Sequence, residues 1–206
     1  KSFGAFLFTF VLMKILIIRF SSIGDIVLTS PIMRCIKQQV KDVEVHYIVK
    51  KQFAFILEHN PYIDKLYTIE KNISEVAKEL KKENYDFVVD LHHNLRSAQV
   101  KSLLGKKSKS FPKLNIEKWL MVNLRINLLP KTHIVDRYFE TVKPLGVEND
   151  GKGLEYFVPQ KDHVDVSTLP TEFQSRLLSG GYIGCVIGAK YFTKQLLHWH
   201  HTDNSR

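Results

Sequence analysis

A serine and an aspartate near the start of the chain, Ser22 and Asp25, have the types and spacing to serve either a reaction or a helix end. A carboxylate can act as a general base and take a proton from an attacking hydroxyl. The same Ser-x-x-acid spacing forms a capping box, which satisfies free amide groups in the first turn of a helix. The positive end of the helix dipole also favours a carboxylate there. The residues alone leave both roles open.

Polar side chains also follow a later apolar run, Phe87 to Val89. They are Asp90, His92, Asn94 and Arg96. If this run is a strand, its carboxyl end is where open α/β sheets bind ligands. Arg96 favours an anionic ligand, whereas Asp90 and Asn94 could equally cap the next helix.

A third group of polar residues, His133, Asp136 and Arg137, lies further along the chain. It could bind a ligand, or it could form an ion pair that holds a helix. The lysine-rich stretch 101–113 has two readings as well, a solvated basic loop or a contact for an acidic acceptor.

Alternating strands and helices must position these residues. Apolar runs predict strands at 14–19, 44–49, 66–69 and 87–90. Helical spacing predicts one helix from Ile26 to Gln39 and others at 52–57, 73–83, 95–104, 119–126 and 135–145. Near the end of the chain, a helix is expected at 171–178 and a strand at 182–188. This alternation indicates βαβ units and a parallel α/β sheet, with Asp25 just beyond the first strand.

Two phosphate-binding motifs are absent from the first strand–helix turn. A dinucleotide-binding turn needs three glycines, and this one has only Gly24. A P-loop needs G-x-x-x-x-G-K-[ST], which does not occur. An acidic residue in the first helical turn would also repel a phosphate, so the turn favours a carboxylate directed into the cleft.

Four stretches of the chain resemble family 9 glycosyltransferases, the lipopolysaccharide heptosyltransferases. They are 14–31 (KILIIRFSSIGDIVLTSP), 86–97 (DFVVDLHHNLRS), 133–138 (HIVDRY) and 187–194 (IGAKYFTK). The resemblance implies a GT-B architecture, in which two Rossmann-like domains face each other across a cleft. The acceptor would bind the N-terminal domain and the nucleotide sugar the C-terminal one.

The resemblance also implies a division of the chain. Residues 13–150 would form the acceptor-binding Rossmann-like domain, 151–180 a linker region, and 181–206 the start of the nucleotide-sugar domain. Residues 1–12 read as a non-native extension, with a membrane anchor as the alternative. Residues 197–206 also read as non-native, because Leu197 stands where the family has proline.

Roles for single residues follow from the same resemblance. Asp25 matches the catalytic base of an enzyme that inverts the anomeric carbon, which implies one base and no covalent intermediate. The residues expected to bind the acceptor are Ser22, Gly24, His92, Asn94, Arg96 and Arg137, and those expected to bind the donor are Thr193 and Lys194. No cofactor and no metal ion are expected.

The implied reaction is transfer of heptose from ADP-heptose, or a similar nucleotide sugar, to an anionic lipopolysaccharide precursor. Such an enzyme would be cytoplasmic, with possible peripheral contact to the inner membrane. The family's later donor-site residues have no counterpart in this sequence, so we expect the chain alone to be inactive.

Composition leaves other functions open. The chain has 206 residues and a formal net charge of +9, which favours anionic partners without choosing among them. The alternatives are another GT-B sugar transferase or a non-catalytic basic domain that binds a membrane or nucleic acid. No aromatic stacking pattern accompanies the charge, so nucleic acid is not an expected partner. Cys35 and Cys185 are expected to be reduced thiols in a cytosolic protein.

Overall fold

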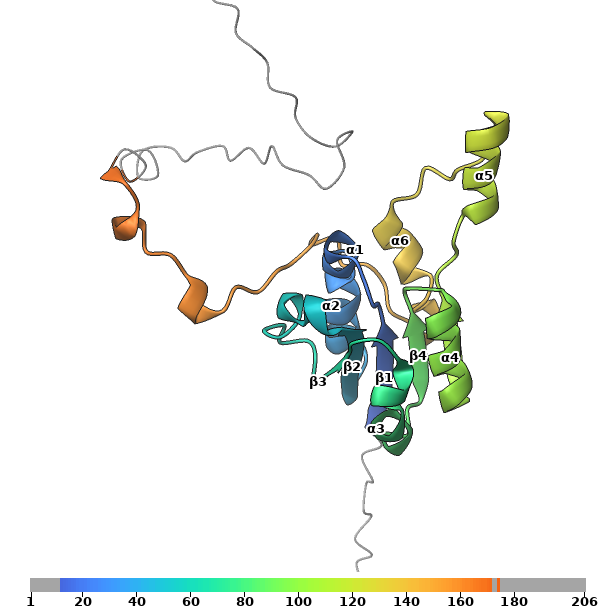
Figure 1. Cartoon of the computed structure of the whole chain (residues 1–206), viewed down its shortest axis with the longest axis horizontal. Coiled ribbons are helices and arrows are strands. Elements are labelled where there is room, and N and C mark those ends of the chain that lie inside the picture. The colour runs from blue at the N-terminus through green and yellow to red at the C-terminus, as the bar shows by residue number, and fades with distance from the viewer. Residues whose placement is uncertain (1–11, 172–173, 175–206) are drawn as a thin grey trace, which may run out of the picture. The chain divides into compact units, whose positions relative to one another are not determined.

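The computed structural model describes residues 12–171 and 174, and its centre is a five-stranded parallel sheet (Figure 1). The strands are β1 (Met13–Ile18), β2 (Val43–Lys50), β3 (Lys65–Ile69), β4 (Phe87–Asp90) and β5 (Lys107–Ser110). Their order is β3-β2-β1-β4-β5, and every neighbouring pair is parallel. The predicted Rossmann-like α/β sheet is confirmed.

Helices connect the strands and pack on both faces of the sheet. The α-helices are α1 (Ile23–Val27), α2 (Ser30–Gln39), α3 (Ala77–Lys82), α4 (Leu95–Leu104), α5 (Asn115–Leu124) and α6 (Ile134–Phe139). The 3-10 helices are η1 (Lys51–Ile56), η2 (Ile73–Glu75), η3 (Lys143–Leu145), η4 (Gln160–Asp162) and η5 (Val166–Thr168).

Alternate residues of β1 supply the two hydrophobic cores. Ile15 and Ile17 are fully buried in a core that includes residues of α1, α2 and α6, and Leu16 and Ile18 in one with residues of α3 and α4. Each such side chain contributes about 1.5–3 kcal/mol to stability. Burial on both faces explains why β1 is a continuous apolar run.

Three predicted helices differ from the structure. The single helix expected from Ile26 to Gln39 is wrong, because α1 ends at Val27 and α2 begins at Ser30. Pro31 has no amide hydrogen and therefore sits in the first turn of a helix. The Thr29 hydroxyl donates to the carbonyl of Ile26 at 2.6 Å. Likewise, the helix expected at 73–83 is divided into η2 and α3, and the one expected at 135–145 into α6 and η3.

A strand occupies part of the lysine-rich stretch 101–113, for which a solvated basic loop was one of the two readings. β5 pairs with β4 at the edge of the sheet, where its lysine side chains stay exposed. Its residues alternate Lys and Ser, so no apolar pattern marks it. Charged edge strands of this kind prevent pairing with another molecule.

The chain divides into two compact units, Lys1–Pro159 and Gln160–Arg206. The expected boundaries at 150 and 180 stay predictions. The helix expected at 171–178 lies almost wholly outside the described residues. The strand expected at 182–188, the first eleven residues of the expected extension 1–12, and the tail 197–206 lie outside them. Among residues 12–171 and 174, no helix combines the length and apolar content needed to cross a membrane.

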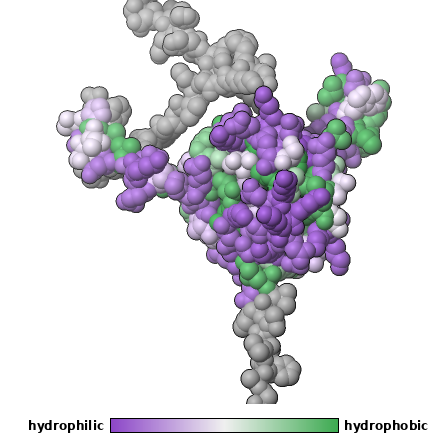
Figure 2. Space-filling view, turned by 60° about the horizontal axis from the view of Figure 1, so that its bottom comes forward, coloured by the Kyte–Doolittle hydropathy of each residue, from purple (hydrophilic) through white to green (hydrophobic). Residues whose placement is uncertain are grey.

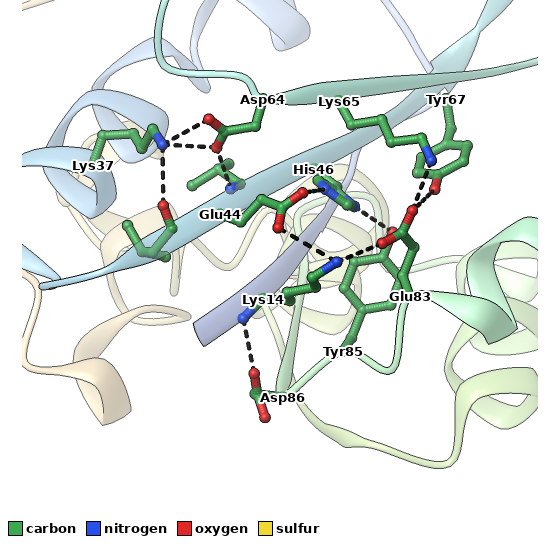
Figure 3. A network of polar contacts seen from close by, with 12 residues as sticks. Lys14, Lys37, Glu44, His46, Asp64, Lys65, Tyr67, Glu83, Tyr85 and Asp86 are labelled. Carbon is green, nitrogen blue, oxygen red and sulfur yellow. Dashed lines mark hydrogen bonds and ion pairs between the residues drawn. The ribbon is translucent and has the colours of Figure 1, made fainter. Parts of the chain in front are cut away.

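A network of ion pairs lies at the amino ends of β1, β2 and β3 (Figure 3). Glu83 accepts from Lys14 at 2.7 Å, from Lys65 at 2.7 Å and from the Tyr67 hydroxyl at 2.8 Å. Buried His46 bridges the carboxylate of Glu44 at 2.7 Å and the hydroxyl of Tyr85 at 2.8 Å. Glu44, His46 and Glu83 could together hold a cation, but the ammonium of Lys14 already contacts both carboxylates.

Candidate active site

Asp25 lies in the first turn of α1, just beyond the carboxyl end of β1. Its Oδ2 accepts from the Ser22 hydroxyl at 3.0 Å and from the Ser22 backbone amide at 3.3 Å. The same oxygen lies 2.6 Å from Nη2 of Arg19. The Asp25 side chain is 40% exposed, so the carboxylate is held from one side and open on the other.

Arg19 fixes this carboxylate because it is itself buried and anchored to two loops. Its Nε donates to the carbonyl of Ser21 at 2.7 Å, and its Nη1 donates to the carbonyl of Leu91 at 2.5 Å. Leu91 follows β4, so one guanidinium ties the turn after β1 to the turn after β4. Because Nε and Nη1 of Arg19 bond to backbone carbonyls, Nη2 is the nitrogen that remains to orient Asp25.

The pKa of Asp25 is lowered from its ordinary value. Burial alone would raise the pKa, but the positive charge of Arg19 and the hydrogen bonds from Ser22 outweigh that effect. Asp25 is therefore ionised at neutral pH, which is the state that a general base requires.

A cavity of about 340 Å³ opens in front of Asp25. Its lining comes from the turn after β1, the turn after β4, the segment between β5 and α5, the start of α5, and α6: Arg19, Asp25, His92, Phe111, Lys113, Asn115, Lys118, Ile134, Arg137 and Tyr138. Four of these residues are cations and one is an anion. Such a cavity attracts an anionic ligand while keeping one carboxylate available.

Two nitrogen atoms of the cavity residues are poised for a ligand. Nδ1 of His92 and Nε of Arg137 are buried, and neither has a hydrogen-bond partner within the described part of the chain. Burial, Arg19 and Lys113 together lower the pKa of His92 to about 4, so its ring is neutral at pH 7. A neutral ring can accept a hydrogen bond at one nitrogen and donate at the other.

Arg137 is held in place by its other contacts. Its Nη2 donates to the carbonyl of Pro112, and its guanidinium lies 5.8 Å from the centroid of the Phe111 ring. These contacts do not use Nε of the guanidinium, which is buried.

Asp90 and Asn94 organise the turn after β4. Asp90 is fully buried and accepts from the Ser97 hydroxyl at 2.8 Å and from the His93 amide at 2.7 Å, and Lys101 lies 2.9 Å away. Asn94 caps α4 through the amide of Ser97 at 2.9 Å. Both residues position the loop that carries His92.

The remaining predicted site residues are placed as follows. Ser22 contacts Asp25, and Gly24 lies in the first turn of α1, where an added Cβ would have free space. Arg96 is not among the residues lining the cavity, and its guanidinium lies 5.7 Å from the centroid of the Phe20 ring. Thr193 and Lys194 lie outside the described residues.

The chain is similar in sequence to two curated enzymes, although no protein-family model matches it. It is 33% identical over 135 residues to lipopolysaccharide heptosyltransferase 1 of Campylobacter coli, a match that covers 61% of this chain and 40% of that protein. It is 27% identical over 137 residues to lipopolysaccharide heptosyltransferase 3 of Escherichia coli K12, covering 60% and 40%. Over the matched part, this chain is heptosyltransferase-like.

Solved structures support the fold of this heptosyltransferase-like chain. A family 9 glycosyl transferase from Veillonella parvula matches 90% of the chain with a TM-score of 0.63 and 20% identity, over 57% of its own length. The E. coli heptosyltransferase WaaC with ADP matches 69% with a TM-score of 0.54 and 22% identity, over 50% of its length. The heptosyltransferase-like chain thus spans about 40% of the length of the curated relatives it matches.

Three cations that line the cavity are absent from the sequence-based list of site residues: Arg19, Lys113 and Lys118. A signal for Arg19 did exist, since a charged residue directly after a buried strand needs a partner. Lys113 belongs to the stretch in which an acceptor contact was one of two alternatives. Lys118 carries no local signal, because any exposed helix has lysines of this kind.

Proposed function

We propose that this chain supplies the acceptor side of an inverting heptosyltransferase. The reaction is transfer of heptose from ADP-heptose to an anionic precursor of lipopolysaccharide. The observation that carries the proposal is the ionised carboxylate of Asp25, oriented by Arg19 and Ser22 at the mouth of a cation-lined cavity. The names of the similar proteins supply the sugar and the class of acceptor.

The geometry suggests a division of labour between the two carboxylate oxygens. The contacts of Arg19 and Ser22 within the described residues are to Oδ2. Oδ1 would accept the proton of the acceptor hydroxyl as that oxygen forms its bond to the anomeric carbon. The bond from the anomeric carbon to the diphosphate breaks at the same time, and the diphosphate leaves with the electron pair. Because the acceptor oxygen attacks the face opposite the leaving diphosphate, this single step inverts the anomeric centre.

The cations of the cavity would hold the acceptor. Lys113, Lys118 and Arg137 can neutralise its acidic groups, and neutral His92 can bond to a hydroxyl. The donor would rest on the region that contains Thr193 and Lys194. The reaction would take place in the cytoplasm, at the inner face of the inner membrane, where a lipid-anchored acceptor is presented.

Replacing Asp25 by Asn tests the proposed base. The amide keeps the size of the side chain and can still accept a hydrogen bond from Ser22, but it loses the ion pair with Arg19, so the free energy of unfolding should fall by about 1.5–3 kcal/mol. It cannot take a proton, so turnover should fall by roughly a hundredfold or more. Turnover is measured in a version that carries a complete donor domain.

Binding of the acceptor to the 206-residue chain is the companion measurement. The affinity for a heptose-free lipopolysaccharide precursor should change little in Asp25→Asn and fall about tenfold or more in Arg137→Ala, because an ion pair is lost. Near-normal turnover in a folded Asp25→Asn variant would remove Asp25 from the mechanism. Unchanged acceptor affinity in Arg137→Ala would remove the cavity from acceptor binding.

A further inference from the structure

Helix α5 exposes apolar side chains that the rest of the described chain does not cover. None of its ten residues is buried. Ile116 is 74% exposed, Trp119 57% and Val122 75%. The chain beyond the helix continues the pattern with exposed Ile126 and Leu128. An apolar surface this extensive on one projecting element marks an interaction site.

The figures show where this surface lies. In Figure 1, α5 projects away from the sheet beyond the carboxyl ends of its strands. In Figure 2, hydrophobic side chains gather on the projecting lobe at the upper right that contains α5, whereas the visible face of the sheet domain is largely hydrophilic. The apolar side chains of α5 therefore do not belong to the hydrophobic core of this unit.

Basic residues flank the apolar surface. Residues 106–131 contain seven lysine or arginine residues and one acidic residue, Glu117. The cations nearest in sequence to the exposed apolar residues are Lys113, Lys118, Arg125 and Lys131. Apolar residues with flanking cations are the composition of helices that lie in the interface of an anionic bilayer.

The same helix borders the candidate active site. Asn115 and Lys118, in its first turns, line the cavity that contains Asp25. Trp119 and Val122 follow within one turn and are exposed to solvent. A surface that holds α5 would thus lie directly beside the place where an acceptor is bound.

We propose that α5 and the segment that follows it dock this protein on an anionic phospholipid bilayer. The apolar side chains enter the region between headgroups and acyl chains, and the flanking cations contact lipid phosphates. The inference rests on the proposed function in one respect, since a lipid-anchored acceptor explains why the docking surface adjoins the site. A protein partner is the weaker occupant, because the surrounding charge is almost wholly of one sign and matches an anionic surface.

Trp119 is a direct reporter of this docking. The chain has two tryptophans, Trp119 and Trp199, so a Trp199→Phe background leaves Trp119 alone. On vesicles of phosphatidylcholine with 30% phosphatidylglycerol, Trp119 emission should shift to the blue, and brominated acyl chains should quench it. Vesicles of phosphatidylcholine alone, or 0.5 M salt, should reduce the shift, because the electrostatic contribution is lost or screened.

Two matched variants separate α5 from the rest of the chain. Val122→Asp should lower partitioning onto the anionic vesicles about tenfold or more. Val164→Asp changes the same residue type at a similarly exposed position, 70%, and should leave partitioning within twofold. Arg125→Glu combined with Lys131→Glu should also lower it about tenfold or more. Each variant is checked for native folding by circular dichroism.

Three outcomes would overturn the proposal. These are an unshifted Trp119 spectrum, equal partitioning of the Val122→Asp and Val164→Asp variants, and a protein dimer in which Trp119 is buried without lipid. The vesicle assay uses no donor and no acceptor, and turnover is measured with a water-soluble acceptor fragment. Loss of one activity without the other therefore shows whether the docking or the proposed reaction has failed.

Discussion

At the scale of single residues, the state of the candidate site depends on Arg19. Its guanidinium keeps Asp25 ionised, and with burial and Lys113 it keeps His92 neutral. In the proposed reaction, one cation would therefore prepare a carboxylate to accept a proton and a ring to bond a hydroxyl. Its carbonyl contacts to Ser21 and Leu91 hold it where both effects operate.

The lowered pKa of His92 predicts a dependence of stability on pH. The folded protein has a His92 pKa of about 4, and the unfolded chain has one near 6.5. Between these values the unfolded state binds more protons, so the contribution of neutral His92 to stability is present above pH 6.5 and is lost as the pH falls toward 4. The free energy of unfolding of His92→Gln should therefore decrease less than that of the wild type as the pH falls from 6.5 to 4.

Urea denaturation at pH 4.5, 5.5, 6.5 and 7.5 measures the difference in free energy of unfolding between the wild type and His92→Gln. This difference should change little between pH 6.5 and 7.5 and should change more below that range. A difference independent of pH throughout would show that His92 is not kept neutral in the fold.

At the scale of elements, α2 holds the turn 148–153 through a buried arginine. Arg34 is 1% exposed, and its guanidinium pairs with Asp150 at 2.7 Å and with Glu155 at 2.8 Å. It also donates to the carbonyl of Gly153 at 3.0 Å. The turn 148–153, at the start of the expected linker region 151–180, is thus held to α2.

Removing Arg34 should be costly. Arg34→Ala leaves the carboxylates of Asp150 and Glu155 without their cation, and because both carboxylates are partly exposed the free energy of unfolding should fall by about 1.5–3 kcal/mol. Lys37→Ala is the control on the same helix, since Lys37 pairs with Asp64 at 2.7 Å where both groups are partly exposed. That variant should lose about 1 kcal/mol or less. Equal losses in chemical denaturation would contradict the account.

At the scale of the molecule, the two ends of the strands differ in how their charges are balanced. At the amino ends, Lys14 and Lys65 are paired with Glu44 and Glu83 (Figure 3). At the carboxyl ends, four cations line a cavity with one carboxylate. Balanced charge stabilises the fold, and the excess of positive charge at the cavity would favour an anionic ligand.

The ion-pair network at the amino ends of the strands should contribute to stability in acid. Hydrogen bonds from Lys14 and Lys65 lower the pKa of Glu83 to about 2, against 4.5 ordinarily. Its contribution to stability is therefore present above about pH 4.5 and is lost as the pH falls toward 2. Glu83→Gln should lower the free energy of unfolding by about 1.5–3 kcal/mol at pH 7.

The same variant should lose less stability than the wild type between pH 4.5 and 2. Thermal melting at pH 7, 4.5, 3 and 2 checks the effect, with Glu70→Gln as a control, because its pair with Lys51 is exposed. Parallel melting curves for the wild type and Glu83→Gln across this range would show that the network does not carry acid stability.

The sequence by itself determined the type of sheet and the place of the candidate base. The apolar runs at β1 and β4 are local patterns, and burial on both faces leaves few other residue types possible there. Asp25 could be placed beyond β1 because a strand followed by a helical pattern has its turn at a known end. Roles for Thr193 and Lys194 stay predictions.

Only the tertiary structure decided how distant residues combine. β5 has no apolar pattern, and its existence depends on backbone pairing with β4. Lys113 and Arg137 line the same cavity as Asp25 although they lie about 90 and 110 positions further along the chain, an arrangement that no local spacing encodes. The break between α1 and α2 depends on Pro31 and the Thr29 hydroxyl acting against an otherwise helical pattern. Local patterns specify elements, whereas long-range contacts specify which side chains share a cavity.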